Sequence, residues 1–228
     1  VRIEHGRYAG LVGERPDIEP IMALGPKCGV DDPEAVLYLY HLAGALGLDV
    51  ISAGSVLAFA IDLYERGILT VEDTGGLALR WGDAEAMERM MRRIAGREGF
   101  GDVLAEGVRR AAQRIGRGAE HYAYHSKGLE LPGYDPRAAW GTALGYAVSS
   151  RGADFTSVYP APEFRWTPEQ GRAVLGSAQA VARLSPEGKG ALVRRTAAVS
   201  AVLDSLGICK VPALSVVGDY SLEAEARL

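Results

Sequence analysis

The sequence predicts a mainly α-helical protein made of two multi-helical subdomains. Three observations favour this fold class. Alternating runs typical of strands are scarce, and only 7% of the residues are aromatic. The 29 glycines often stand directly after stretches whose apolar residues recur three and four positions apart, where they would end helices. A chain of 228 residues allows one large domain or two small ones.

Composition excludes several classes of protein. A formal net charge of −4 leaves no broad basic face, so nucleic acid is not an expected partner. No apolar run approaches the roughly 20 residues of a membrane span, and no basic-then-apolar start predicts a signal peptide. Cys28 and Cys209 are too few for a disulfide scaffold and fit a reducing cytoplasm. They are also too few for an iron–sulfur cluster, which usually takes four thiolates.

The first 66 residues predict three helices after an initial loop or pair of short strands. A short helix over residues 17–24 ends at a Gly-Pro pair. Asp32 is placed to cap the second helix, which Gly47 stops. Either Ser52 or Ser55 opens the third. The second and the third have apolar residues at helical spacing.

Two further helices follow in the first subdomain. Asp83 caps the one over residues 84–95, and Asp102 caps the one over residues 103–115. The first of these has a stripe at helical spacing that we interpret as core, formed by Met87, Met90, Met91 and Ile94.

The helical pattern stops near residue 120, at a stretch with glycine and two prolines. We therefore predict domains at 1–120 and 121–228. In the second, Asp135 opens a helix to about residue 149, Thr167 caps another, and Ser185 opens the last, which runs to about Leu206.

Three short segments carry residues suited to chemistry. Asp204 and Cys209 flank the glycine turn that ends the last helix, where a carboxylate could accept a hydrogen bond from a ring amine and a thiol could bind a soft metal. A similar Gly-Leu turn ends in Asp49. Glu19 lies among apolar residues, where desolvation could raise its pKa and make it a proton-transfer group. On spacing alone, we favour the structural interpretation of these segments, as carboxylates at helix ends and a buried thiol.

Seven segments, taken in order, resemble the tungsten-containing aldehyde ferredoxin oxidoreductase family. They are EPIMALGPKCGVDDPEAV, LGLDVISAG, FAIDLYERGIL, WGDAEAM, IAGREGFGDVLAEGVRRAA, KGLELPGYDPRAAWGTALGYAVSSRGAD and VLDSLGICK. The resemblance implies that residues 1–120 match the helical domain 2 of that family and residues 121–228 its domain 3, truncated at the C-terminus.

The resemblance also implies an activity and its cofactors. Family members oxidise aldehydes to carboxylic acids with water as the oxygen source. They use a tungsten (or molybdenum) bis-pterin centre and pass electrons through one [4Fe–4S] cluster to ferredoxin. By residue, Glu19 matches a proposed proton-transfer group, Asp49 and Asp204 match pterin-contacting carboxylates, and Cys209 matches a cluster ligand. Arg151 and His125 lie in family-like runs without an assigned role.

Some positions depart from the family pattern. The N-terminal pterin domain and its Cys-x-x-Cys-x-x-x-Cys motif are absent, Gly44 replaces an aspartate, and Asp154-Phe155 stands where many members have histidine. We therefore expect the chain alone to be inactive and to bind no cofactor, with the missing domain, or a separate chain carrying it, as a partner. A homodimer is a further arrangement that we consider. Two alternatives stay open: a helical scaffold without chemistry, and a family member acting on a substrate other than an aldehyde.

Overall fold

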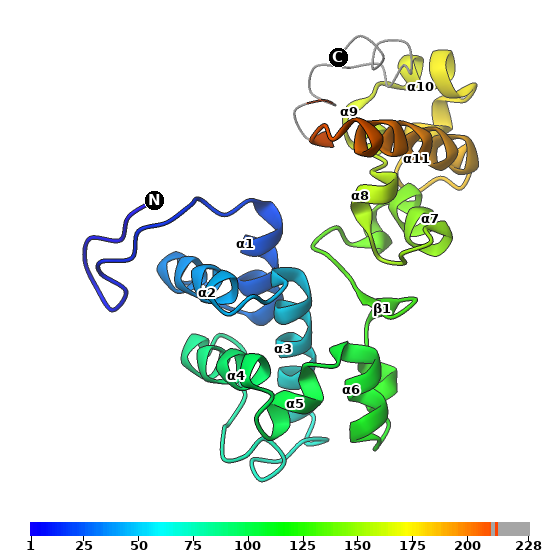
Figure 1. Ribbon diagram of the computed structural model, residues 1–228. Coiled ribbons are helices and arrows are strands. Elements are labelled where there is room, and N and C mark those ends of the chain that lie inside the picture. Colours follow the sequence, from blue (N-terminus) through cyan, green and yellow to red (C-terminus); the bar gives the residue numbers. More distant parts are fainter. Residues whose placement is uncertain (211–212, 214–228) are drawn as a thin grey trace. The chain divides into compact units, whose positions relative to one another are not determined.

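A computed structural model describes residues 1–210 and residue 213 (Figure 1). The chain divides into two compact units, unit 1 over residues 1–133 and unit 2 from Tyr134 onward. The described residues form eleven α-helices and one two-stranded sheet, which confirms the predicted mainly α-helical fold.

Unit 1 is arranged around one helix, α3, which contacts every other α-helix of the unit and the hairpin (Figure 1). The hairpin pairs β1 (His125–Ser126) with β2 (Leu129–Glu130) in antiparallel register. Short 3-10 turns cover Pro26–Cys28 and Ala119–Tyr122. The α-helices of unit 1 are α1 (Ile18–Leu24), α2 (Pro33–Ala45), α3 (Val50–Glu65), α4 (Ala84–Gly96), α5 (Phe100–Leu104) and α6 (Gly107–Ile115).

Helix caps explain where the helices of unit 1 begin. The carboxylates of Asp32 and Asp83 accept backbone N–H bonds at 2.9 Å, so α2 and α4 start as predicted. The predicted start of α3 at a serine was wrong, because Asp49 caps it instead. The single helix predicted over residues 103–115 is two helices, α5 and α6, because Gly107 has a φ of +80° that interrupts the helical path.

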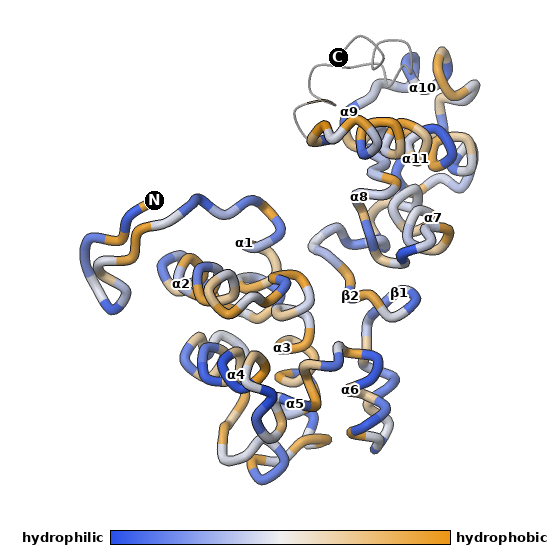
Figure 2. Tube along the Cα trace, in the orientation of Figure 1, coloured by the Kyte–Doolittle hydropathy of each residue, from blue (hydrophilic) through white to orange (hydrophobic). Residues whose placement is uncertain are grey.

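The core of unit 1 is one continuous apolar cluster. The predicted stripe on α4 is buried within it, each of its four side chains being 5% exposed or less. Hydrophobic residues run along most of α3, whereas α6 is largely hydrophilic (Figure 2). Removal of this apolar surface from water is the main force that holds the helices of unit 1 together.

Unit 2 has a long helix, α11, that contacts α7 and α8. Its 3-10 turns are Pro136–Ala138 and Ala178–Val181. A small apolar cluster includes Val199 and Leu203 of α11. The α-helices of unit 2 are α7 (Trp140–Val148), α8 (Phe155–Val158), α9 (Pro162–Arg165), α10 (Pro168–Leu175) and α11 (Lys189–Leu206).

Unit 2 agrees with the sequence prediction at one cap and differs from it at two helices. Thr167 and Gln170 form the capping box that begins α10. The helix predicted from Asp135 starts as a 3-10 turn and is interrupted at Ala139, whose backbone is extended. The last helix begins at Lys189, because Gly188 before it has a φ of +73°.

The boundary between the units lies at Gly133 rather than near residue 120. The hairpin belongs to unit 1 because Glu130 and Leu131 form hydrogen bonds to α3 and to Lys27. Among the described residues, no single helix is both long and apolar enough to cross a membrane; α2 and α3 pass that test as a pair, with a bend of 116° between them.

Candidate functional site

Glu19 lies in the first turn of α1 and is 8% exposed. Its Oε2 accepts a hydrogen bond of 2.7 Å from the backbone N–H of Gly133, whereas its Oε1 is buried and has no hydrogen-bond partner among the described residues. Gly133 permits this approach, because a Cβ there would lie 2.8 Å from the Cβ of Met22. Glu19 is therefore a buried carboxyl group with one oxygen that accepts no hydrogen bond from the described residues.

The surroundings of Glu19 change its acidity. Burial raises its pKa, and the Gly133 N–H and the charge of Lys27 lower the pKa by less, so the pKa stays above its ordinary value. Lys27 is not bonded to Glu19: its Nζ donates to the carbonyl of Leu131 at 2.7 Å and to Ser55 Oγ at 3.0 Å. Burial lowers the pKa of Lys27. A carboxyl group with a raised pKa is suited to proton transfer near neutral pH.

Glu130 fixes the backbone that contacts Glu19 and Lys27. It is 5% exposed, its Oε1 accepts from the N–H of Val108 at 2.8 Å, and its Oε2 accepts from Ser52 Oγ at 2.9 Å. These bonds attach the hairpin to α3 and to the start of α6. The segment of Leu131 and Gly133 follows directly, so Glu130 positions the two backbone groups that Lys27 and Glu19 bind.

Lys27 and Glu130 were not predicted from the sequence as members of the site. Each is a charged residue inside an otherwise apolar stretch, in ALGPKCGV and GLELP. Charged residues are rarely buried unless they are paired or hydrogen-bonded. That pattern could have marked both residues as members of a buried polar network.

Asp49 is exposed and caps α3, its Oδ1 accepting from the backbone N–H of Ser52 at 2.8 Å. A carboxylate has about four lone-pair positions, so this bond leaves acceptor capacity for a ligand. The role predicted for Asp49 in binding pterin stays a prediction.

Asp204 and Cys209 lie on either side of the turn that ends α11 in unit 2. Gly207 adopts a left-handed conformation there, with a φ of +69°. Asp204 is exposed, and its Oδ1 accepts a bond of 2.6 Å from Lys210 Nζ. Cys209 is a free, exposed cysteine. Both groups are accessible to a ligand, and their predicted roles stay predictions.

The other cysteine is structural. Cys28 is fully buried, and its Sγ donates weakly to the carbonyls of Ala23 and Gly54. Burial raises the pKa of its thiol to about 12. Within residues 1–210 and at residue 213, no three His, Cys, Asp or Glu side chains are grouped so as to hold a metal ion.

Asp154, one of the two residues that depart from the family pattern near position 155, has a structural role. Asp154 caps α8, with its Oδ1 accepting from the N–H of Thr156 at 3.0 Å. Burial raises the pKa of Asp154, but hydrogen bonds from Ser157 and Thr156 and the charge of Arg151 lower it overall. Arg151 lies 2.9 Å from the Asp154 carboxylate. His125 lies in β1, where its Nδ1 accepts from the Gly128 N–H.

Comparison with known proteins gives a consistent picture. The family model "Aldehyde ferredoxin oxidoreductase, domains 2 & 3" matches residues 1–228. The "Aliphatic sulfonate oxidoreductase, WOR-like subunit" of Pyrococcus furiosus is 38% identical over 77% of this chain and 29% of its own length. The tungsten-containing aldehyde ferredoxin oxidoreductase of Pyrococcus abyssi is 44% identical over 64% of this chain and 24% of its own length.

A solved structure is also similar. The active-site complex BamBC of benzoyl coenzyme A reductase, in complex with 1,5 dienoyl-CoA, aligns with a TM-score of 0.55 and 31% identity, over 65% of this chain and 22% of that chain. The chain thus spans less than a third of the length of each of these three proteins.

Proposed function

We propose that this chain forms the helical part of a pterin-dependent oxidoreductase containing tungsten or molybdenum. The reason is that the chain belongs to the aldehyde ferredoxin oxidoreductase family, whose domains 2 and 3 it matches. The complete enzyme would convert an aldehyde and water into a carboxylic acid, two protons and two electrons. Ferredoxin would accept the electrons through a [4Fe–4S] cluster. The observation that carries the proposal is the buried Glu19, whose Oε1 has no partner among the described residues.

The residues present fit these cofactors by the chemistry of their donors. The exposed carboxylates of Asp49 and Asp204 would accept hydrogen bonds from pterin ring amines, and charge-assisted bonds of this kind are short and strong. The exposed thiol of Cys209 would supply one ligand to the cluster, with the others coming from outside this chain. When bound, the metal centre supplies the two-electron oxidation.

Glu19 would take the proton that water releases as it adds to the aldehyde carbon. Its raised pKa brings the carboxyl group closer to neutral pH, where a general base is most effective. The Gly133 N–H stabilises the ionised form at one oxygen, and the unpartnered Oε1 is the atom left to receive the proton. Lys27 acts on this equilibrium through its charge, while its hydrogen bonds go to Ser55 and Leu131.

Glu19→Gln in the complete enzyme tests the proposal. We expect kcat for aldehyde-dependent ferredoxin reduction to fall by about 10²- to 10⁴-fold, the usual contribution of a general acid or base. Tungsten content, measured on the same sample, should not change. The matched control is Glu88→Gln, because Glu88 is a partly buried glutamate of unit 1 whose carboxylate is already bonded to Tyr38 and Arg92. Unchanged kcat in a metal-loaded Glu19→Gln enzyme would refute the role of Glu19.

The names of two similar proteins suggest two further substrate classes besides aldehydes. One relative is named for aliphatic sulfonates, and the similar solved structure is that of a benzoyl coenzyme A reductase. Assays of the complete enzyme with an aldehyde, an aliphatic sulfonate and an aryl thioester would separate these substrates. Turnover of an aldehyde alone supports our first proposal, and turnover of one of the other two alone replaces it.

We further propose that the 228-residue chain is inactive by itself and works in the cytoplasm, where Cys28 and Cys209 stay reduced. Elemental analysis for tungsten, molybdenum and iron, with the intact mass of the same sample, tests the first point. We expect no metal at 24.2 kDa. Metal and turnover in a sample of that mass alone would contradict it.

A further inference from the structure

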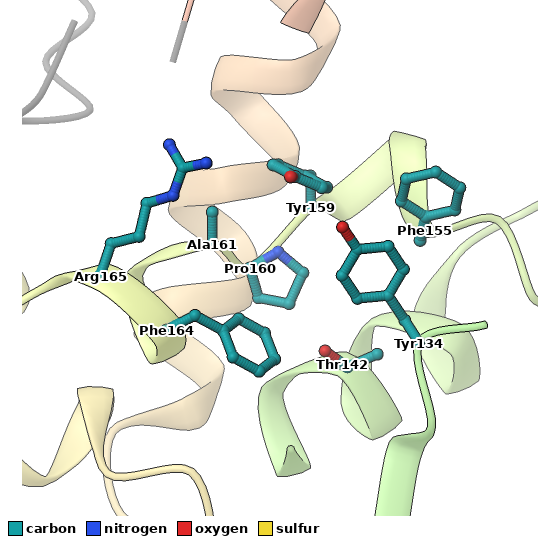
Figure 3. A pocket seen from close by; sticks show the side chains of 8 residues that line it. All are labelled: Tyr134, Thr142, Phe155, Tyr159, Pro160, Ala161, Phe164 and Arg165. Atoms are coloured by element: carbon teal, nitrogen blue, oxygen red, sulfur yellow. The ribbon is translucent and has the colours of Figure 1, made fainter. Parts of the chain in front are cut away.

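Unit 2 contains a pocket that none of the roles above uses (Figure 3). Half of its described lining residues are aromatic, and the wall comes from the segment before α7, from α7, α8 and α9, and from the turn between α8 and α9. The four rings that line it belong to Tyr134, Phe155, Tyr159 and Phe164. All of the lining residues that the structure describes lie in unit 2.

The size and walls of the pocket suit one six-membered ring. The cavity volume is about 150 Å³, close to that of an engineered apolar cavity of about 150 Å³ that stays dry and binds benzene. The ring of Tyr134 stacks on Phe155 at a centroid distance of 5.0 Å and meets Tyr159 and Phe164 edge-on at 6.2 and 6.5 Å. Aromatic walls at these spacings favour a planar, apolar guest.

Thr142 adds one polar group to this wall. The residue is 2% exposed, and its Oγ1 is buried without a hydrogen-bond partner among the described residues. Its backbone N–H is already bonded to Glu163, so the hydroxyl is the polar group left for a ligand. A buried hydroxyl without a partner lowers the stability of the fold. Its presence in a native protein therefore calls for an explanation, such as a ligand that completes its hydrogen bond.

The wall is held in place without a ligand. Thr142 lies in the first turn of α7, which the carboxylate of Glu163 caps, and Glu163 pairs with Lys189 at 2.5 Å. Tyr159 has a φ of +34°, a strained backbone conformation for a residue with a side chain. Strain of this kind occurs preferentially at ligand sites.

Charge in the wall argues for a neutral ligand. Arg165 is the charged residue among the described lining residues, and it is exposed to solvent, where its field is screened. Apart from Arg165, the polar side-chain groups of the described lining residues are three hydroxyls, those of Thr142, Tyr134 and Tyr159. An anion buried there would lose its hydration without gaining a buried cation.

We propose that this pocket binds a neutral compound with one aromatic ring and one carbonyl group. The ring lies among the four aromatic side chains, and Thr142 Oγ1 donates a hydrogen bond to the carbonyl oxygen. Binding involves no metal and no redox step, so this inference can hold or fail independently of the proposed function.

Titration calorimetry on the 228-residue chain tests the proposal with two probes. Acetophenone has the ring and the carbonyl, and ethylbenzene has the same shape without the oxygen. We expect saturable binding of both, with acetophenone the tighter. Thr142→Val should weaken acetophenone binding by about three- to tenfold, the usual worth of one hydrogen bond, and leave ethylbenzene within about twofold. The same variant should unfold at a higher temperature, because it removes the unpartnered hydroxyl.

Thr196→Val is the matched control. Thr196 is a buried threonine of α11 in the same unit, and its hydroxyl donates to the carbonyl of Leu192 outside the pocket. We expect it to leave the affinity for both probes unchanged. Ala161→Phe, which places a ring in the cavity, should abolish binding of both. The proposal is overturned if neither probe saturates the wild-type chain, or if Thr142→Val and Thr196→Val affect acetophenone equally.

Discussion

Glu19 in unit 1 and Glu163 in unit 2 are both buried, with 8% and 6% of the residue exposed, but their carboxylates have different partners. Glu163 uses both oxygens: Oε1 accepts from the Gly141 N–H at 2.6 Å and lies 2.5 Å from Lys189 Nζ, and Oε2 accepts from the Thr142 N–H at 3.3 Å. Glu19 uses Oε2 alone, and its nearby cation, Lys27, is bonded elsewhere.

The difference separates a structural carboxylate from one available for chemistry. The cost of burying the Glu163 carboxylate is offset by its ion pair with Lys189 and by its hydrogen bonds to backbone N–H groups of α7. Glu163 therefore stabilises the start of α7 and holds Lys189, whose Nζ donates to the carbonyls of Ala180 and Ala182. The partners of Glu19 do not fully offset the cost of burying its carboxylate, and its pKa is raised as a result. A buried polar group without a partner in a native structure calls for a functional explanation.

The largest expected effect comes from breaking the Glu163–Lys189 pair. Glu163→Ala should lower the free energy of unfolding by about 3–5 kcal/mol, because it leaves the buried ammonium of Lys189 unpaired. Urea unfolding followed by circular dichroism measures the change. The double variant Glu163→Ala/Lys189→Met removes that charge and should recover part of the loss. A loss below about 1 kcal/mol would show that the pair is not structural.

A smaller effect is expected at Glu130, the carboxylate that attaches the hairpin in unit 1. Glu130→Gln keeps the size of the side chain but weakens its bonds to the Val108 N–H and to Ser52, and should cost about 1–3 kcal/mol. Native-state hydrogen exchange should show the loss of protection concentrated in the first turn of α6. Uniform loss across unit 1 would instead indicate a general packing defect.

Glu19→Gln should have a small effect of the opposite sign, and the effect should depend on pH. A raised pKa means that the folded state binds the proton more tightly than the unfolded state. Wild-type stability therefore falls as pH rises from the ordinary glutamate pKa through the folded pKa. The variant lacks this loss, so its stability relative to wild type should increase across that window and then level off. Thermal unfolding at a series of pH values measures it, and an advantage that shrinks with rising pH would contradict the raised pKa.

The smallest effect is expected at Asp204, which is exposed although it pairs with Lys210. Asp204→Asn should change the free energy of unfolding by less than about 0.5 kcal/mol, since exposed ion pairs contribute little. A larger loss in urea unfolding would give Asp204 a structural role and weaken the interpretation that it is available to a pterin.

Local signals predicted much of the fold. Asp32, Asp83 and Thr167 begin their helices where the sequence placed them, because a cap depends on residues only two or three positions away. The break at Gly107 was not predicted, since its conformation depends on the hairpin: a Cβ there would meet Glu130 Oε1 at 2.8 Å. The short helices α8 and α9 are likewise too short for a periodic signal.

The candidate site was predicted in part. The apolar surroundings of Glu19 indicated a buried carboxyl group, and the structure shows one. Lys27 and Glu130 were not found, because their contacts join residues 104 and 78 positions apart in the chain. No local pattern reports pairings over such separations, and the same holds for the aromatic pocket of unit 2.

The most direct test of the central claim is the titration of Glu19 itself. The side-chain carboxyl carbons of the ¹³C-labelled chain can be followed by NMR against pH, with Glu19→Gln to assign the signal. We predict a midpoint above the ordinary glutamate value of about 4.3 for Glu19, owing to its burial. A midpoint at or below that value would show that the carboxylate is as well compensated as a structural one, and would contradict our account of Glu19.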